Sequence, residues 1–312
     1  MIPHLRRLAL PLPFELSEVN AYLVKLRDGW LLIDTGLNTE DCFQALMRQA
    51  DVDPREIRQI LLTHAHPDHV GGARRLLDLT GAELLMEEAE LEQLRMVAAS
   101  GARPAWLTQP MVRAGVSAEL VERINTAFAD IRPNFVALQP DRVLHEGDVI
   151  ETAAGELRVV KTPGHSTGHA CLFSEEHRTL FAGDTLLESI TPNISWMEGR
   201  DMLGEFLASL RRVAGMEIDV LLPGHYAPFS GHEAWIRETC DHHLVRCEQL
   251  LASLARGAKT ANALVGEIWM RPLAPFHHRF AVFEILAHLE YLRRLEKVWI
   301  DRADEAEVWR AN

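Results

Sequence analysis

Cysteine is scarce in this chain of 312 residues, and the four cysteines stand singly. Because there is no Cys-x-x-Cys pair, the sequence indicates neither a zinc ribbon nor a disulfide framework. We interpret the cysteines as buried free thiols, which suits the reducing cytosol, so we expect a cytoplasmic protein. The residues are Cys42, Cys171, Cys240 and Cys247.

An excess of positive charge and long apolar runs are also lacking. The formal net charge is −13, which repels polyanions, so we expect a small-molecule substrate and no nucleic-acid partner. No apolar run approaches the roughly 18 residues of a membrane span. The short apolar segment after Arg6 and Arg7 lacks the cleavage site of a secretion signal, and we interpret it as a first edge strand. We therefore expect a soluble protein without a membrane partner.

No serine or cysteine nucleophile is required by the chemistry that this sequence indicates. The chain has instead four metal-binding side chains within the six residues from His64 to His69. This cluster directly follows the apolar run from Ile57 to Leu62, which predicts a buried strand. Pro67 predicts a sharp bend that lets the side chains converge. Imidazole and carboxylate groups suit Zn²⁺ or Fe, so we predict a metal site here.

Three further candidate ligands follow other apolar, strand-like runs of the sequence. They are His165, Asp184 and His225, and each lies directly after a glycine. Glycine permits tight turns and a close approach of the backbone. Seven ligand-type residues at the ends of four predicted strands are enough for two metal ions.

The order and spacing of these residues resemble the ligand set of the metallo-β-lactamase-fold hydrolases, as found in glyoxalase-II-like members. The resemblance covers residues 1–235 and includes the early turn Asp34-Thr-Gly. It implies an α/β fold, an αββα sandwich of two mixed sheets faced by helices, with the metals at one edge between the sheets. It also implies that one metal is held by His64, His66 and His165 and the other by Asp68, His69 and His225, with Asp184 bridging them.

Two residues outside that ligand set are expected to support it. The resemblance implies that Asp34 hydrogen-bonds a ligand imidazole and fixes its tautomer. The alternative for Asp34 is a turn residue with a local hydrogen bond of its own. His169, four residues after His165, is expected to lie behind the ligands because the metal positions are already filled.

A pair of zinc ions is the expected cofactor, with iron or manganese as alternatives because the sequence does not determine the metal. Two such ions share a water and lower its pKa, which gives a bridging hydroxide at neutral pH. Asp68 is expected to orient this hydroxide, as the catalytic residue, besides binding metal. We therefore expect hydrolysis of an ester-type bond of a small molecule, namely a thioester, a lactone or an ester. The alternatives are a nuclease or phosphodiesterase, and an iron-dependent oxidoreductase.

Residues 87–140 are predicted to be a helical insertion that the sandwich does not need. It holds two predicted helices joined by the segment 101–111, and a single strand is predicted after it, over 142–150. Trp106 and Met111 give the insertion apolar surface, and we interpret it as a lid that shapes a substrate pocket. The alternative is a hairpin that packs on the scaffold or on a second subunit.

Two more residues are candidates for that pocket because they closely follow predicted ligands. Trp196 lies in the loop after Asp184, and Tyr226 follows His225 directly. Ordinary packing of either aromatic ring is the alternative.

The C-terminal part, residues 236–312, is predicted to hold three helices and a short hairpin. This pattern resembles the winged-helix module that some members of the superfamily carry at this position. Basic and acidic residues are equal in number from residue 237 onward, whereas a nucleic-acid reader usually has a basic face. We expect a structural or a dimerisation role for this part, and in the second case the protein would be a homodimer. A contribution to the substrate pocket is the other interpretation.

Overall fold

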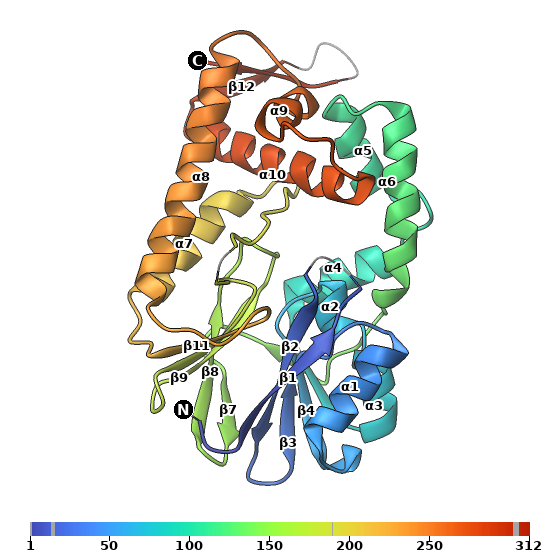
Figure 1. Cartoon of the computed structure of the whole chain (residues 1–312), viewed down its shortest axis with the longest axis vertical. Helices are drawn as coiled ribbons and strands as arrows, with labels where there is room; N and C mark the ends of the chain where they lie inside the picture. The colour runs from blue at the N-terminus through green and yellow to red at the C-terminus, as the bar shows by residue number, and fades with distance from the viewer. Residues whose placement is uncertain (1, 14–15, 189, 302–305) are drawn as a thin grey trace. The chain divides into compact units, whose positions relative to one another are not determined.

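The computed structural model describes residues 2–13, 16–188, 190–301 and 306–312. The chain enters a second compact unit and returns to the first twice before it stays in the second (Figure 1). The first unit comprises Met1–Ala99, Arg132–Pro192 and Ser209–Ile236, and the second comprises Ser100–Ile131, Asn193–Ala208 and Arg237–Asn312.

The first unit contains a six-stranded mixed sheet in the order β1-β2-β3-β4-β5-β6. The pairs from β1 to β3 are antiparallel, and the pairs from β3 to β6 are parallel. The central strands are apolar on both sides, as expected for a sheet that is covered on both faces. The strands are β1 (Leu5–Pro11), β2 (Glu18–Lys25), β3 (Trp30–Ile33), β4 (Ile57–Leu62), β5 (Glu83–Glu87) and β6 (Arg142–Leu144).

Two helices, α1 (Glu40–Ala50) and α3 (Ala73–Thr80), cover one face of this sheet (Figure 1). Thr39 begins α1 by accepting a hydrogen bond from the backbone N–H of Cys42, and the left-handed Asp51 ends it. The buried sides of both helices join the sheet in one apolar cluster. The remaining short helices of this unit are η1 (Pro54–Glu56), α2 (Pro67–Val70), α4 (Glu88–Ala98) and η2 (Arg132–Asn134).

A second mixed sheet of five strands has the order β11-β10-β9-β8-β7. Only the pair of β10 and β11 is parallel among its pairs. The strands are β7 (Val149–Thr152), β8 (Gly155–Lys161), β9 (Ala170–Ser174), β10 (Thr179–Gly183) and β11 (Val220–Pro223). Two mixed sheets with helices confirm the α/β class that the sequence predicted.

The two sheets pack face to face through an apolar layer. Leu31 and Leu61 of the first sheet and Val159 of the second are fully buried in it. The rings of Tyr22 and Phe181 meet edge to face across the layer, with centroids 5.4 Å apart. Each large apolar side chain buried in this way contributes about 1.5–3 kcal/mol to the free energy of unfolding. This layer holds the ends of strands from both sheets in fixed positions.

The single strand predicted over 142–150 is wrong. The first strand there, β6, ends at Leu144, and the next, β7, begins at Val149 in the other sheet. Gly147 between them has a φ of +81°, and Asp148 accepts a hydrogen bond from the backbone N–H of His145 at 2.9 Å. The segment is therefore a turn that carries the chain from one sheet to the other.

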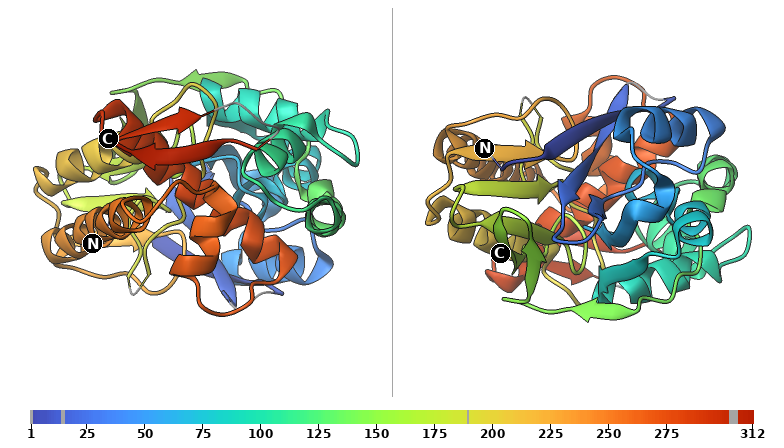
Figure 2. Two further views of the ribbon diagram at one scale, coloured as in Figure 1. Left: turned by 90° about the horizontal axis from the view of Figure 1, so that it is seen from above. Right: turned by 90° about the horizontal axis from the view of Figure 1, so that it is seen from below.

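The second unit is mainly helical and ends in an antiparallel hairpin of two strands, whose paired arrows are visible in Figure 2. Three helices and a hairpin are thus present in the C-terminal part, while its winged-helix identity and the boundary at residue 235 stay predictions. Every helix among the described residues is too short or too polar to span a membrane. The elements are α5 (Ala105–Arg113), α6 (Ala118–Ile131), α9 (Ala261–Ile268), α10 (Pro275–Arg294), β12 (Val298–Asp301) and β13 (Val308–Ala311), and α7 (Met202–Ala214) and α8 (His232–Leu254) each have residues in both units.

Candidate metal centre

The seven predicted ligands follow the ends of four strands of the first unit. Strand β4 leads into the segment from His64 to His69, where α2 begins at Pro67 and turns the chain. Strands of the second sheet supply the others, because His165 follows β8, Asp184 follows β10 and His225 follows β11. The structure gathers the seven in two groups, and within each group the donor atoms lie within 4.8 Å of one another.

The first group consists of His64, His66, His165 and Asp184. Nδ1 of His66 lies 2.9 Å from Nε2 of His64 and 3.0 Å from Nε2 of His165. Oδ2 of Asp184 lies 3.6 Å from Nε2 of His165 and 4.0 Å from Nε2 of His64. Three imidazole nitrogens and one carboxylate oxygen therefore surround a common point.

The second group consists of Asp68, His69 and His225. Oδ2 of Asp68 lies 3.4 Å from Nε2 of His225 and 4.0 Å from Nε2 of His69. Asp184 faces this group too, with Oδ1 3.5 Å from Nε2 of His69 and Oδ2 3.4 Å from Nε2 of His225. Asp184 thus lies between the two groups, where a bridging ligand would be.

The spacing and chemistry of these donors fit metal ions. Ligand atoms about 2.1 Å from a tetrahedral zinc ion are about 3.4 Å from one another. Separations of 3.4 to 3.6 Å recur around Asp184. Nε2 of His69 and Oδ1 of Asp184 are buried and make no hydrogen bond within the described residues. Such orphaned polar atoms cost free energy unless something binds them, so we infer that both groups are metal sites.

The ligand histidines are of two kinds, which differ in the direction of their pKa shift. Burial lowers the pKa of His66 to about 3, and it also holds the pKa of His64 well below its usual value. Burial acts in the same direction on His225, but the carboxylates of Asp184 and Asp68 together outweigh it and raise the pKa of His225 to about 10. At His69 the carboxylates of Asp184, Asp34 and Asp68 together outweigh burial and hold its pKa well above the usual value. Because imidazole binds metal in its neutral form, metal uptake must release the protons of His69 and His225.

Asp34 holds one of these ligands in a single orientation. Its Oδ2 accepts a hydrogen bond from Nδ1 of His69 at 2.8 Å. Oδ1 accepts a second one from the backbone N–H of Thr63 at 2.9 Å. Because the Nδ1 hydrogen of His69 is used in this way, its Nε2 is left to face the metal groups.

We expect Asp34→Asn to weaken metal binding by about 10–100-fold, the usual cost of losing a residue that orients a metal ligand. The amide brings an NH₂ group against either His69 or the backbone of Thr63, and both of these are donors. Chelator competition on the purified variant measures the effect as a dissociation constant for zinc.

The matched control for this variant is Asp51→Asn. Asp51 is exposed and has a φ of 47°, close to the φ of 61° at Asp34, so the same substitution meets a similar backbone without a ligand contact. Equal metal affinities for the two variants would contradict the role of Asp34.

His169 lies against the backbone of a ligand and not within either metal group. The backbone N–H of Asp184 donates to Nε2 of His169 at 3.0 Å. Nε2 is therefore an acceptor, and the ring hydrogen is on Nδ1, which lies 2.8 Å from Oγ1 of Thr162. Burial also holds the pKa of His169 well below its usual value. Both ring nitrogens of this neutral histidine are occupied, and the ring fixes the place where Asp184 leaves its strand.

Asn20, which was not predicted from the sequence, holds the loop of the last ligand. Its Nδ2 donates to the carbonyl oxygens of Pro223 at 2.8 Å and of Tyr226 at 2.7 Å. Its backbone N–H donates to the carbonyl of Gly224 at 2.6 Å. His225 lies within this clamped loop. The available signal was a polar amide in the middle of an otherwise apolar strand, β2.

The residues predicted to shape a pocket have different surroundings. Met111 is fully buried, and Trp106 packs edge to face on Phe128 with centroids 5.3 Å apart, both within the second unit. Tyr226, in the first unit, is half-buried and has a φ of 67°, which is rare for an aromatic residue. A pocket role for these residues and for Trp196 stays a prediction.

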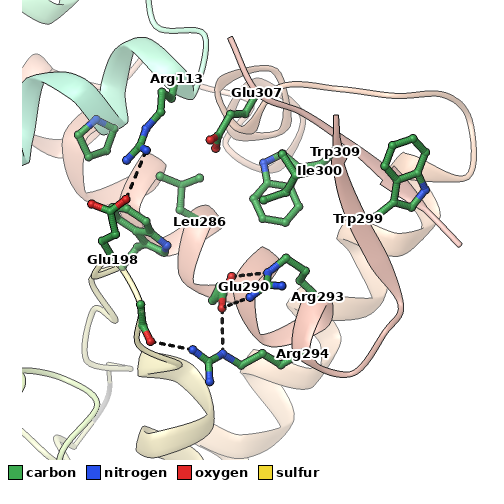
Figure 3. Close-up of a pocket in the computed structure, with 13 residues that line it drawn as sticks. Arg113, Glu198, Leu286, Glu290, Arg293, Arg294, Trp299, Ile300, Glu307 and Trp309 are labelled. Atoms are coloured by element: carbon green, nitrogen blue, oxygen red, sulfur yellow. Dashed lines mark hydrogen bonds and ion pairs between the residues drawn. The ribbon is translucent and has the colours of Figure 1, made fainter. Parts of the chain in front are cut away.

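A cavity of about 600 Å³ lies within the second unit (Figure 3). Trp196 is one of its wall residues, together with the indoles of Trp299 and Trp309. Glu290 accepts hydrogen bonds from two neighbouring arginines of the wall, at 2.7 Å and 2.9 Å, as the dashed lines in Figure 3 show. Arg293 and Arg294 of this wall are thus both paired with Glu290.

Comparison with known families agrees with the ligand geometry. Residues 15–225 match the model of the Metallo-beta-lactamase superfamily. The crystal structure of the metallo-beta-lactamase family protein TTHA1429 from Thermus thermophilus is 32% identical to this chain, with a TM-score of 0.88. The match covers 100% of this chain and 99% of that protein, so the likeness includes the C-terminal part.

Curated relatives are more distant in sequence. The lactamase-like protein adaB of Aspergillus niger is 27% identical over 81% of this chain, and the chain spans only 63% of its length. The atrochrysone carboxyl ACP thioesterase of Aspergillus fumigatus is 26% identical over 86% of this chain and 74% of its own. The acyl-coenzyme A thioesterase MBLAC2 of Homo sapiens is 25% identical, over 68% of this chain and 75% of its own.

Proposed function

Because the chain belongs to the metallo-beta-lactamase superfamily and is a metal-dependent hydrolase, we propose that the bond it cleaves is a thioester. Two relatives of different origin that match most of the chain are named as thioesterases, one for an acyl carrier protein and one for acyl-coenzyme A. The donor set of the two metal groups supports the same reaction class, since it needs no covalent nucleophile from the protein.

The protein's part in the reaction is to hold the ions and to orient the reactants. His64, His66 and His165 would hold one ion, and His69, His225 and Asp68 the other, with Asp184 between them. A pair of ions supplies an activated water as the nucleophile and polarises the carbonyl oxygen under attack. Asp34 and His169 keep their neighbouring ligands in place throughout, because their hydrogen bonds do not involve the substrate.

Asp68 is the ligand best placed to act on the attacking water. Its side chain is 21% exposed, against 8% for Asp184, so one carboxylate reaches the solvent side of the site. An oxygen there can accept a hydrogen bond from the water and direct it at the carbonyl carbon. The leaving thiol of a thioester has a pKa of about 8.5 and departs as a thiolate without a proton. An amide nitrogen lacks this advantage, and for this reason we favour thioesters over amides.

A panel of matched substrates tests the proposal. The chain is reconstituted separately with zinc, iron(II) and manganese, and the metal content is measured by plasma emission. Each form is then given one acyl group as its coenzyme A thioester, its N-acetylcysteamine thioester and its oxygen ester, with a lactone of the same carbon number and bis(p-nitrophenyl) phosphate beside them. We expect the highest kcat/KM for a thioester, with two ions per chain.

The panel also separates the alternatives. Faster turnover of the phosphodiester than of every thioester would overturn the proposal in favour of a phosphodiesterase. Oxygen uptake by the iron form, without hydrolysis of any ester, would overturn it in favour of a redox enzyme. A preference for coenzyme A over N-acetylcysteamine would indicate that the carrier itself is bound, whereas equal rates would indicate recognition of the acyl group.

A further inference from the structure

The N-terminal end of α4 carries a carboxylate that the metal chemistry does not use. Glu90, in the first turn of this helix, is fully buried within the first unit. An ionised side chain at such a position costs free energy unless hydrogen bonds compensate for its lost hydration. The hydrogen-bond partners of Glu90 therefore indicate its role.

Those partners come from two different loops. Oε2 of Glu90 accepts a hydrogen bond from the backbone N–H of Ala65 at 2.7 Å. Oε1 accepts one from the backbone N–H of Gly168 and another from Oγ1 of Thr167, the latter at 3.4 Å. Ala65 lies between His64 and His66 in the chain.

Each of these loops delivers ligands to the same metal group. The loop after β4 supplies His64 and His66, and the loop after β8 supplies His165 three residues before Gly168. The two loops follow strands of different sheets, and beside them one backbone hydrogen bond, from the N–H of Ala170 to the carbonyl of Thr63 at 3.0 Å, joins the two segments directly. A single carboxylate that accepts from both backbones links them across the gap between the sheets, and charge-assisted bonds of this kind are about twice as strong as neutral ones.

The helix that carries Glu90 is itself anchored to the second loop. Oε2 of Glu87 caps α4 by accepting from the backbone N–H of Ala89 at 2.6 Å, and its Oε1 pairs with Lys161 at the end of β8. A Cβ atom built on Gly168 would lie only 1.9 Å from Oε2 of Glu87. The loop at Gly168 therefore packs directly against the first turn of α4, and this contact holds Glu90 in position relative to the loop.

We propose that Glu90 is a positioning residue of the metal centre, which sets the separation of the loops that carry His66 and His165. Nδ1 of His66 and Nε2 of His165 lie 3.0 Å apart, and that spacing depends on how the two loops are joined. The role concerns metal retention, so it holds whichever ester-type bond the enzyme cleaves.

Three variants of the full chain test this role. Glu90→Gln keeps the length of the side chain but presents an NH₂ group to one of two backbone donors. Glu90→Asp keeps the charge but is one methylene too short to reach both loops. Glu92→Gln is the matched control, because Glu92 is exposed on the same helix and the substitution removes the same charge. The zinc dissociation constant, from competition with a chromophoric chelator, and the melting temperature of the metal-free protein are measured for each.

We expect both Glu90 variants to bind zinc about 10–100-fold more weakly than the parent, and the control to bind it equally well. Parental affinity in Glu90→Gln would overturn the proposal, even with a lower melting temperature, because the role would then be structural only. Weak binding in Glu90→Gln together with parental affinity in Glu90→Asp would also overturn it, since charge and not the link between the loops would be responsible.

Discussion

Asp184→Ala is expected to lower kcat/KM by more than about 100-fold, since losing a residue that merely orients a metal ligand already costs about 10–100-fold. The side chain lies between the two groups, with Oδ2 3.6 Å from Nε2 of His165 and Oδ1 3.5 Å from Nε2 of His69. Its removal takes one donor from each group at once. Plasma emission after dialysis should then find at least one ion per chain fewer than in the parent.

A second carboxylate on the same sheet serves as the control for Asp184→Ala. The side chain of Asp219 is 61% exposed and pairs with Arg178 at 3.1 Å, away from the ligands. Asp219→Ala should keep the parental metal content and rate. If Asp184→Ala retained both ions and the full rate on the best thioester, the assignment of Asp184 as the bridge would be refuted.

Gly224→Ala should have a comparable effect although glycine contributes no ligand. An added Cβ would lie 2.1 Å from Oδ1 of Asp184 and 2.9 Å from Cε1 of His69. The backbone cannot retreat, because the N–H of Gly224 donates to the carbonyl of Gly183 at 2.7 Å and its carbonyl accepts from Asn20 at 2.6 Å. The carboxylate must therefore move out of the bridge, and we expect metal affinity and kcat/KM to fall by more than about 100-fold.

The same substitution at Gly266 gives the comparison. Gly266 lies in α9, and a Cβ there would meet no atom within 4 Å. Alanine favours helix by about 1 kcal/mol over glycine, so Gly266→Ala should keep activity and raise the melting temperature slightly. Zinc titration and thermal melting of both variants provide the measurement, and parental zinc affinity in Gly224→Ala would mean that the ligands tolerate displacement.

The sequence predicted the places where strands end better than the places where the chain changes sheet. Ligands such as His165 and His225 each follow an apolar run and a glycine in the sequence, and in the structure each of them follows the end of a strand. The segment 142–150 shows the limit of this kind of prediction. Apolar residues alternate in the same way whether two short strands lie in one sheet or in two. The left-handed turn at Gly147 and the hydrogen bond between His145 and Asp148 divide β6 from β7.

Helix α5 could not be predicted for a different reason. Pro110 lies inside it and is buried. Proline lacks the backbone N–H that an inner helical turn uses, so its presence within 101–111 argued against a helix there. In the structure, Pro110 is near the C-terminal end of α5, and its carbonyl accepts from the backbone N–H of Ala114 at 2.8 Å. Packing in the second unit overrides the local preference.

The residues at the site that were not predicted from the sequence share one property: they act through the backbone of other loops. Asn20 binds the carbonyl oxygens on either side of His225, and Glu90 binds amides next to His66 and near His165. Contacts of this kind join positions far apart in the chain, and no spacing rule connects them. Metal ligands, by contrast, are recognisable by residue type together with their place after strand-like runs of the sequence.

The wide sequence separation of the donors has a thermodynamic consequence. They are drawn from residues 64 to 225 and from both sheets, so a partly folded chain does not hold the complete set. An ion that binds only the native state, at about 100 times its Kd, adds about 2.7 kcal/mol to the free energy of unfolding. The free energy of unfolding then depends on the concentration of free metal in the surroundings. A chelator, which lowers that concentration, acts on this protein as a mild denaturant.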